Sequence, residues 1–68
     1  MKEWLVAIRE GQKMTQEMVA DLVGIAQGTY SNIENGKRRP GVAVAKRIAA
    51  VLNFDWTLFF QDAEEESA

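Results

Sequence analysis

The amide side chains of Gln27 and Asn32 are groups that could recognise a ligand by hydrogen bonding. Glutamine and asparagine can each form two hydrogen bonds at once with an adenine base. Tyr30 and Ile33 have the spacing of apolar residues on the inner face of a helix. We therefore expect a helix over about residues 26–35 that presents both amides outward or toward its start.

Three consecutive cations, Lys37, Arg38 and Arg39, follow this segment. Such a run is usually a solvated loop, but beside a helix that reads bases it favours contact with phosphate groups. Gly36 precedes the run and Pro40 follows it, so we expect a turn there. The pattern indicates a cationic edge next to the amide-bearing helix.

The composition argues against catalysis. The 68 residues include no histidine and no cysteine, so the commonest general base, the commonest metal ligand and every disulfide are excluded. Nucleophilic or zinc-dependent chemistry would need unusual substitutes. The sequence therefore predicts no enzyme, no metal site and no cofactor, and no small-molecule ligand is evident.

Length and charge indicate one small domain with an acidic tail. The net charge is −2, but residues 1–60 hold all eight basic residues and six of the ten acidic ones, which leaves that segment at +2. A local basic patch, rather than the total charge, decides whether a protein can bind phosphate groups. We expect a domain over residues 1–61 and a flexible acidic tail over residues 62–68.

The sequence shows no membrane or export signal. The largely uncharged, apolar run over residues 51–60 is far shorter than the roughly 20 apolar residues that span a bilayer. The first residues lack the apolar segment of a signal peptide. We therefore expect a cytoplasmic protein.

The segment over residues 14–36 predicts two short helices joined by a tight turn. Thr15 is a candidate N-cap for a helix over residues 16–23, and Gly24 is expected to end it in a left-handed conformation. The amide-bearing helix follows at once. Such a pair makes a helix-turn-helix, whose second helix can enter the major groove of DNA.

Three further helices complete the predicted fold. We place them over about residues 2–10, 42–52 and 56–61, with Asp55 as the cap of the last one. Asn53 suits a left-handed position at the end of the 42–52 helix. We therefore expect an all-α, compact bundle of five short helices.

The order of these residues resembles the lambda-repressor-like (Xre-type) helix-turn-helix family over roughly residues 4–60. The matching features are Thr15-Gln16, Ala20, Gly24-Ile25, the run Ile33-Glu34-Asn35-Gly36-Lys37, and Pro40. Two positions depart from the family pattern: Lys13 stands where a glycine is usual, and Ala26 stands where a serine or threonine usually caps the second helix of the motif. The resemblance implies a lambda-repressor-like DNA-binding domain.

The resemblance also assigns candidate contact residues. Those at base-contacting positions are Gln27, Gly28, Thr29 and Asn32. Those at phosphate-contacting positions are Gln16, Asn35, Lys37, Arg38, Arg39 and Arg9. Arg9 also matches, with Glu34, a salt-bridged pair behind the phosphate site. We favour this pairing over a plain surface charge at the end of the first helix.

Gly28 is an unfavourable residue for an exposed first turn, by about 1 kcal/mol relative to alanine. Either the helix needs the close approach of a backbone or a base at this point, or the glycine is tolerated because it lies near the helix end. Both explanations stay open.

The C-terminal segment has more large apolar side chains than a short helix can bury, which makes Trp56, Phe59 and Phe60 candidates for a homodimer interface. With the resemblance, this predicts a sequence-specific regulator of transcription that binds double-stranded DNA. We expect a repressor of phage or mobile-element type that binds a palindromic operator as a dimer. Two alternatives stay open: a protein-interaction module with the same fold, such as an antitoxin or an anti-repressor, and a control protein of a restriction-modification system.

Overall fold

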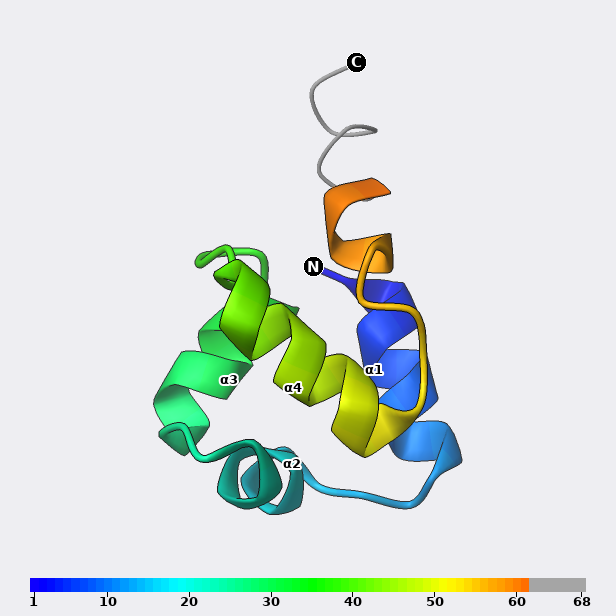
Figure 1. Cartoon of the computed structure of the whole chain (residues 1–68). Coiled ribbons are helices and arrows are strands. Elements are labelled where there is room, and N and C mark those ends of the chain that lie inside the picture. Colours follow the sequence, from blue (N-terminus) through cyan, green and yellow to red (C-terminus); the bar gives the residue numbers. More distant parts are fainter. Residues whose placement is uncertain (62–68) are drawn as a thin grey trace.

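The computed structural model describes residues 1–61, which form four α-helices and a final helical turn (Figure 1). The helices are α1 (Glu3–Gly11), α2 (Gln16–Val23), α3 (Gln27–Glu34) and α4 (Val42–Leu52), and the last turn is helical over residues 58–61. The described residues contain no strand, so the predicted all-α fold of five short helical segments is confirmed. The tail predicted over residues 62–68 lies outside the described part of the chain.

The expected bounds of α2 and α4 are confirmed, and the other elements differ by one or two residues at an end. The first helix, α1, begins and ends one residue later than expected. The third, α3, is one residue shorter at each end, because Ala26 has an extended backbone and Asn35 lies just past the last helical residue. The last helical turn begins two residues later than expected.

Local chemistry fixes both ends of α2. The Oγ1 of Thr15 accepts a hydrogen bond from the backbone N–H of Met18 at 3.1 Å. Gly24 adopts the left-handed conformation, with φ 87°, and its N–H donates to the carbonyl of Ala20 at 2.8 Å. The predicted N-cap and the predicted helix stop are therefore both present, and they set where α3 can begin.

Two residues other than glycine have a positive φ in the described chain. Asn53, at 61°, ends α4 in the left-handed conformation that its residue type predicts. Lys13, at 59°, lies in the loop between α1 and α2, at the position where the family pattern has glycine. A lysine there is strained, because its Cβ approaches the following carbonyl oxygen.

All four helices contribute to the core. Its most completely buried apolar members are Leu5, Val19, Ala20, Tyr30, Ile33, Ala45, Ile48 and Leu52. Helix α2 packs against both α3 and α4, and the small side chain of Ala20 suits such close crossings. None of the helices in residues 1–61 has the length and hydropathy needed to cross a membrane.

Phe59 belongs to this core. Only 3% of its surface is exposed, and its ring meets that of Trp4 at a centroid distance of 5.2 Å. Phe54 completes the group, at 5.4 Å from Trp4 and 5.7 Å from Phe59. Phe59 therefore fills the core of its own chain and, contrary to our expectation, offers almost no surface to a second subunit.

Candidate nucleic-acid interface

The outer side of α3 presents the residues that the sequence assigned to base contact. Gln27, Gly28 and Asn32 are exposed, and Thr29 is half-buried. Tyr30, on the opposite side of the helix, is fully buried. The spacing of apolar residues therefore predicted the outward direction of both amides correctly.

Nothing within the described chain requires a glycine at position 28. A Cβ atom built on Gly28 would have no heavy atom within 4 Å, and its φ is not in the left-handed range. The first turn of α3 therefore has open space in front of it, which a bound molecule could occupy.

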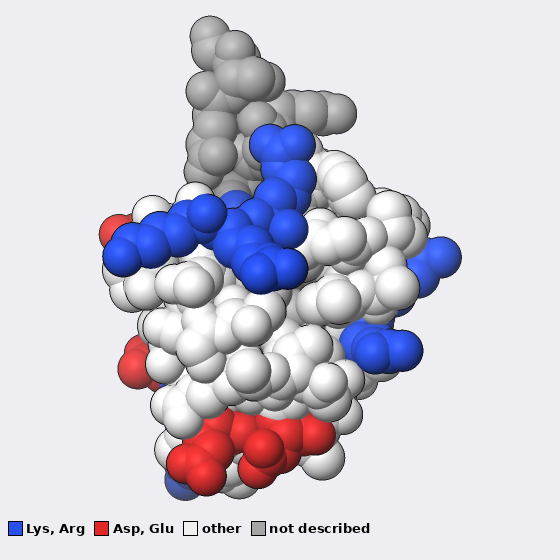
Figure 2. Space-filling view, turned by 90° about the vertical axis from the view of Figure 1, so that its left-hand side faces the viewer, with Lys and Arg blue, Asp and Glu red and all other residues white. Residues whose placement is uncertain are grey.

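The face around α3 has opposite charges at its two ends. Figure 2 shows Lys and Arg side chains grouped at the upper end, Asp and Glu side chains at the lower end, and mostly uncharged surface between them. Lys37, Arg38 and Arg39 are exposed in the loop after α3, and Glu17 and Asp21 are exposed on α2. A polyanion would be attracted to the loop end of this face and repelled from the α2 end.

The main chain holds the cationic loop against the end of α3. The N–H groups of Lys37 and Arg38 both donate to the carbonyl of Asn32, at 2.9 and 3.2 Å. Gly36 makes the turn possible with a φ of 79°, in the left-handed range that favours glycine. The carbonyl group of Asn32, a base-contact candidate, thus holds the backbone of Lys37 and Arg38, two phosphate-contact candidates.

A buried carboxylate lies behind this surface. Glu34, the last residue of α3, is 1% exposed, and its Oε2 accepts a hydrogen bond from the Nε of Arg9 at 2.7 Å. Its Oε1 accepts from the Nη2 of Arg9 at 3.3 Å and from the Nε2 of Gln16 at 2.9 Å. Arg9 also donates from Nη1 to the carbonyl of Met14 at 2.8 Å. The expected pair of Arg9 and Glu34 is therefore present, and it joins the end of α1 to the end of α3.

The hydrogen bonds keep this carboxylate ionised. Burial by itself would raise the pKa of Glu34, but hydrogen bonding, foremost from Arg9, and the positive charge of Arg9 outweigh burial and bring the pKa below its ordinary value. The bond to Glu34 in turn raises the pKa of the Arg9 guanidinium. Burial raises the pKa of the Tyr30 phenol, and the nearby Glu34 carboxylate raises it further. The hydroxyl of Tyr30 is buried and makes no hydrogen bond to the described residues.

The main chain of Glu34 is also tied to α1. The backbone N–H of Lys2, just before α1, donates to the carbonyl of Glu34 at 2.7 Å. Both ends of α1 therefore contact the same residue, one through the main chain and the other through Arg9.

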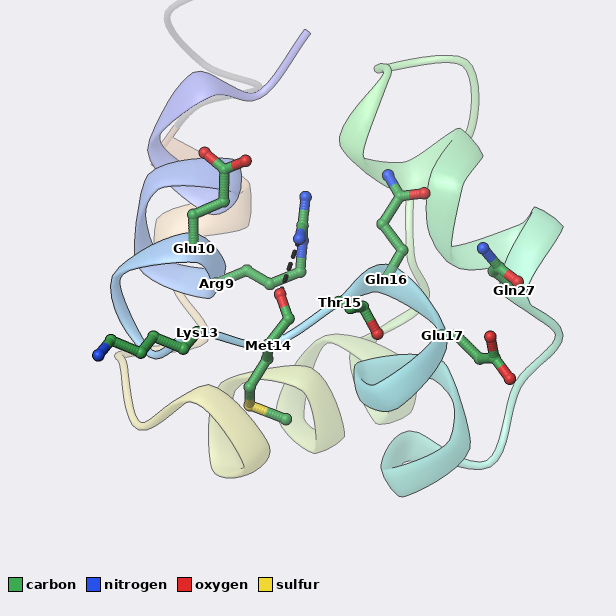
Figure 3. Close-up of a pocket in the computed structure, with 8 residues that line it drawn as sticks. All are labelled: Arg9, Glu10, Lys13, Met14, Thr15, Gln16, Glu17 and Gln27. Carbon is green, nitrogen blue, oxygen red and sulfur yellow. Dashed lines mark hydrogen bonds between the residues drawn. The ribbon is translucent and has the colours of Figure 1, made fainter.

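A pocket of about 460 Å³ lies between the end of α1 and the starts of α2 and α3 (Figure 3). Its lining residues are Arg9, Glu10, Lys13, Met14, Thr15, Gln16, Glu17 and Gln27. Figure 3 shows Gln16 pointing from the start of α2 into the space between α1 and α3. The pocket therefore brings a phosphate-contact candidate and a base-contact candidate, Gln16 and Gln27, to one place.

The remaining candidates differ in how free they are to bind a ligand. Asn35, Lys37, Arg38 and Arg39 are all exposed. Arg9 is only 12% exposed and already uses three N–H groups within the chain. Two of its five N–H groups remain for a phosphate contact, which stays a prediction.

Sequence reasoning missed the hydrogen bond between Gln16 and Glu34. The two residues are 18 positions apart, and only the packing of α2 against α3 brings them together. One signal was available: Glu34 follows Ile33 and Tyr30 on the inner side of α3, where an acid needs polar partners.

Residues 1–61 contain no group of three or more His, Cys, Asp or Glu side chains that could hold a metal ion. Comparison with known proteins gives two matches. A family model described as helix-turn-helix matches residues 5–59. The chain is also 45% identical over 67 residues to "Uncharacterized HTH-type transcriptional regulator YqaF" of Bacillus subtilis (strain 168), and the match covers 98% of this chain and 88% of that protein.

Proposed function

The chain belongs to the lambda-repressor-like (Xre-type) helix-turn-helix family of non-enzymatic, DNA-binding transcriptional regulators, and from this premise we propose that it is a sequence-specific repressor of phage or mobile-element type. It binds a palindromic double-stranded DNA operator as a homodimer and works in the cytoplasm. The observation that supports this proposal is the exposure of Gln27 and Asn32 on α3, directly beside a cationic loop.

Helix α3 enters the major groove. Gln27 and Asn32 can read base edges there, because each amide offers a donor and an acceptor. Thr29 lies between them and is partly accessible, and Gly28 leaves room for close approach to a base or the sugar-phosphate backbone. These four residues are the base-contacting set.

Phosphate contacts come from both sides of α3. Lys37, Arg38 and Arg39 contact one strand through the exposed loop, with Asn35 beside them. Gln16 contacts the backbone from the pocket at the start of α2. Farther along α2, the exposed carboxylate of Asp21 repels phosphate, so charge limits how the domain can be oriented on DNA.

A second copy of the chain pairs through the surface near the C-terminal helical turn. Trp56 and Phe60 are half-buried there, with ring centroids 5.4 Å apart in an edge-to-face arrangement. The Nζ of Lys46 lies 5.0 Å from the centroid of the Trp56 ring. Two subunits joined at this surface would read half-sites about one helical turn, or roughly 34 Å, apart.

The experiment is selection of bound sequences from random DNA, followed by titration of the selected site. We expect a palindrome. Replacing Gln27 or Asn32 by alanine should cost about 1–3 kcal/mol on that site and relax its sequence preference, whereas Gln12→Ala, an exposed amide outside α3 and outside the pocket, should leave the sequence preference unchanged.

The phosphate contacts are tested through salt. Arg38→Ala should weaken binding to every sequence and reduce the slope of log affinity against log salt concentration by about 1. Arg47→Ala removes an equal charge from an exposed position on α4 and is the matched control. Unchanged affinity and slope for Arg38→Ala would show that the loop does not contact DNA.

The competing proposal is a protein-interaction module that has kept the fold, such as an antitoxin or an anti-repressor. The charge of the chain favours this alternative. The whole chain has a net charge of −2 and residues 1–60 only +2, so general electrostatic attraction to DNA is weak. The burial of Phe59 counts against it, because less aromatic surface remains for a partner. A control protein of a restriction-modification system would bind DNA in the same way, and a promoter assay separates it from a repressor.

A further inference from the structure

We propose that Glu34 is a positioning residue for base recognition: its buried carboxylate fixes the side-chain amide of Gln16 with the nitrogen inward and the carbonyl oxygen toward the pocket that Gln27 also lines. The inference rests on the proposed binding of DNA by α3. It extends that proposal from surface residues to a buried one that no nucleic acid can touch.

The orientation of Gln16 follows from the chemistry of its partner. An ionised carboxylate can only accept hydrogen bonds, so the group 2.9 Å from the Oε1 of Glu34 must be the amide nitrogen. A reversed amide would place two oxygen atoms against each other at that distance. The carboxylate stays ionised because two N–H groups of Arg9 also hold it. The polarity of the Gln16 amide is therefore set by a charge inside the protein.

This polarity decides what Gln16 offers to its surroundings. Its Nε2 has one N–H left after the bond to Glu34, and its Oε1 is a free acceptor in the pocket. Gln27 lines the same pocket with an exposed amide. An N–H of Gln27 can donate to that acceptor, which leaves its other N–H and its oxygen for the N7 and N6 positions of an adenine. Reversal of the Gln16 amide would present N–H groups to Gln27 instead, and Gln27 would lose the orientation that favours adenine.

Glu34→Gln is the substitution that tests this orientation. It replaces one of the two carboxylate oxygens with an NH₂ group and keeps the other as a carbonyl oxygen. The remaining carbonyl oxygen stays with the Nε of Arg9, the shortest bond of the group, since a guanidinium prefers an acceptor. The new NH₂ group then takes the place of Oε1, where it faces Gln16 and loses the longer, 3.3 Å hydrogen bond from the Nη2 of Arg9. Two amide nitrogens cannot bond to each other, so Gln16 must turn its oxygen inward.

The first measurement uses the free, full-length protein and needs no DNA. In side-chain ¹⁵N spectra, one Nε2 proton of Gln16 should lie well downfield of the other and exchange slowly with solvent. Glu34→Gln should abolish both properties, while Gln27→Ala, which removes an amide that does not contact Glu34, should leave the slow exchange unchanged. Two equivalent, fast-exchanging protons in the wild type would overturn the proposal, whether or not the protein binds DNA.

The second measurement uses the selected DNA site and a version of it with the base opposite Gln27 changed. A bidentate amide contact gives a preference on the order of 10- to 100-fold, and Glu34→Gln should reduce it several-fold while binding to unrelated DNA persists. In a Gln16→Met background the same substitution should have no further effect on preference. A full effect of Glu34→Gln in that background would show that Glu34 acts by another route, and an unchanged preference in the folded single variant would also refute the proposal. If Glu34→Gln does not fold, the proposal is tested by the side-chain ¹⁵N spectrum of Gln16 in the wild-type protein.

Discussion

Removing Arg9 should destabilise the domain far more than removing any other charge on its surface. Arg9→Met keeps an unbranched chain of similar length but deletes the guanidinium, which leaves the Glu34 carboxylate with one side-chain donor, Gln16. The carboxylate is 1% exposed, so water cannot replace the lost hydrogen bonds without a rearrangement of the core.

The size of the effect can be worked out from this geometry. Removing one partner of a buried ion pair typically costs about 3–5 kcal/mol. Arg9 itself is 12% exposed and one bond to Gln16 persists, so some water can reach the carboxylate from the outer side. We therefore expect a loss of about 2–4 kcal/mol, out of a total of about 3–10 kcal/mol for a domain of 68 residues. Such a loss corresponds to a fall in Tm of roughly 10–25 °C.

The assay is urea unfolding at pH 7, followed by far-UV circular dichroism and by the fluorescence of the two tryptophans. The decisive comparison is with the double variant Arg9→Met/Glu34→Met, in which both charges are gone. Because the main cost comes from an uncompensated buried charge, the double variant should be more stable than Arg9→Met by about 1–3 kcal/mol. A double variant less stable than Arg9→Met would show that packing, rather than the unpaired carboxylate, carries the effect.

Four further outcomes are expected. Lys13→Gly should raise the free energy of unfolding by about 0.5–1 kcal/mol, since relief of the left-handed strain exceeds the entropy of the added glycine; a lower urea midpoint would contradict this. Ala26→Ser should add about 1 kcal/mol, because Ala26 already has the extended backbone of an N-cap but no capping oxygen; the cap should show as protection of the first N–H groups of α3 from exchange. Gly28→Ala should stabilise the free protein by about 1 kcal/mol, and it should weaken operator binding if DNA approaches closely there but not if the glycine is merely tolerated. The pKa of Glu34 is lower in the folded than in the unfolded chain, so its stabilising effect is complete above its ordinary pKa and is lost as the pH falls through the folded value; unfolding curves of Glu34→Gln should therefore lack this part of the acid destabilisation below about pH 4.5.

Local signals in the sequence were enough for most of the fold. Thr15, Gly24 and Asn53 define helix ends through their own side chains or backbone freedom, and these effects do not depend on distant residues. The outward direction of Gln27 and Asn32 likewise follows from the apolar spacing within one helix.

The features that the sequence did not reveal depend on packing between elements. Phe59 and Phe60 are adjacent and similar in chemistry, yet it is Phe59 that enters the core, where it packs against Trp4 and Phe54. The bond from Gln16 to Glu34 likewise depends on how α2 and α3 cross. The resemblance located the residues of the candidate interface, but the orientation of the Gln16 amide could be assigned only once its partner on α3 was known.

The buried pair of Arg9 and Glu34 is better explained by orientation than by stability. Apolar residues of similar volume often stabilise a domain as well as a buried ion pair does, so folding alone does not require a charge at the end of α3. Among strong side-chain acceptors, however, only an ionised carboxylate offers no donor, so it is the group that holds the amide of Gln16 with its nitrogen inward. The two roles can be separated in one protein. Arg9→Met/Glu34→Met should unfold at a urea concentration between those of Arg9→Met and the wild type, and it should still bind DNA through its exposed cationic loop. It should, however, distinguish the operator from other sequences less well. A double variant with wild-type discrimination would leave the buried charge without a function in recognition.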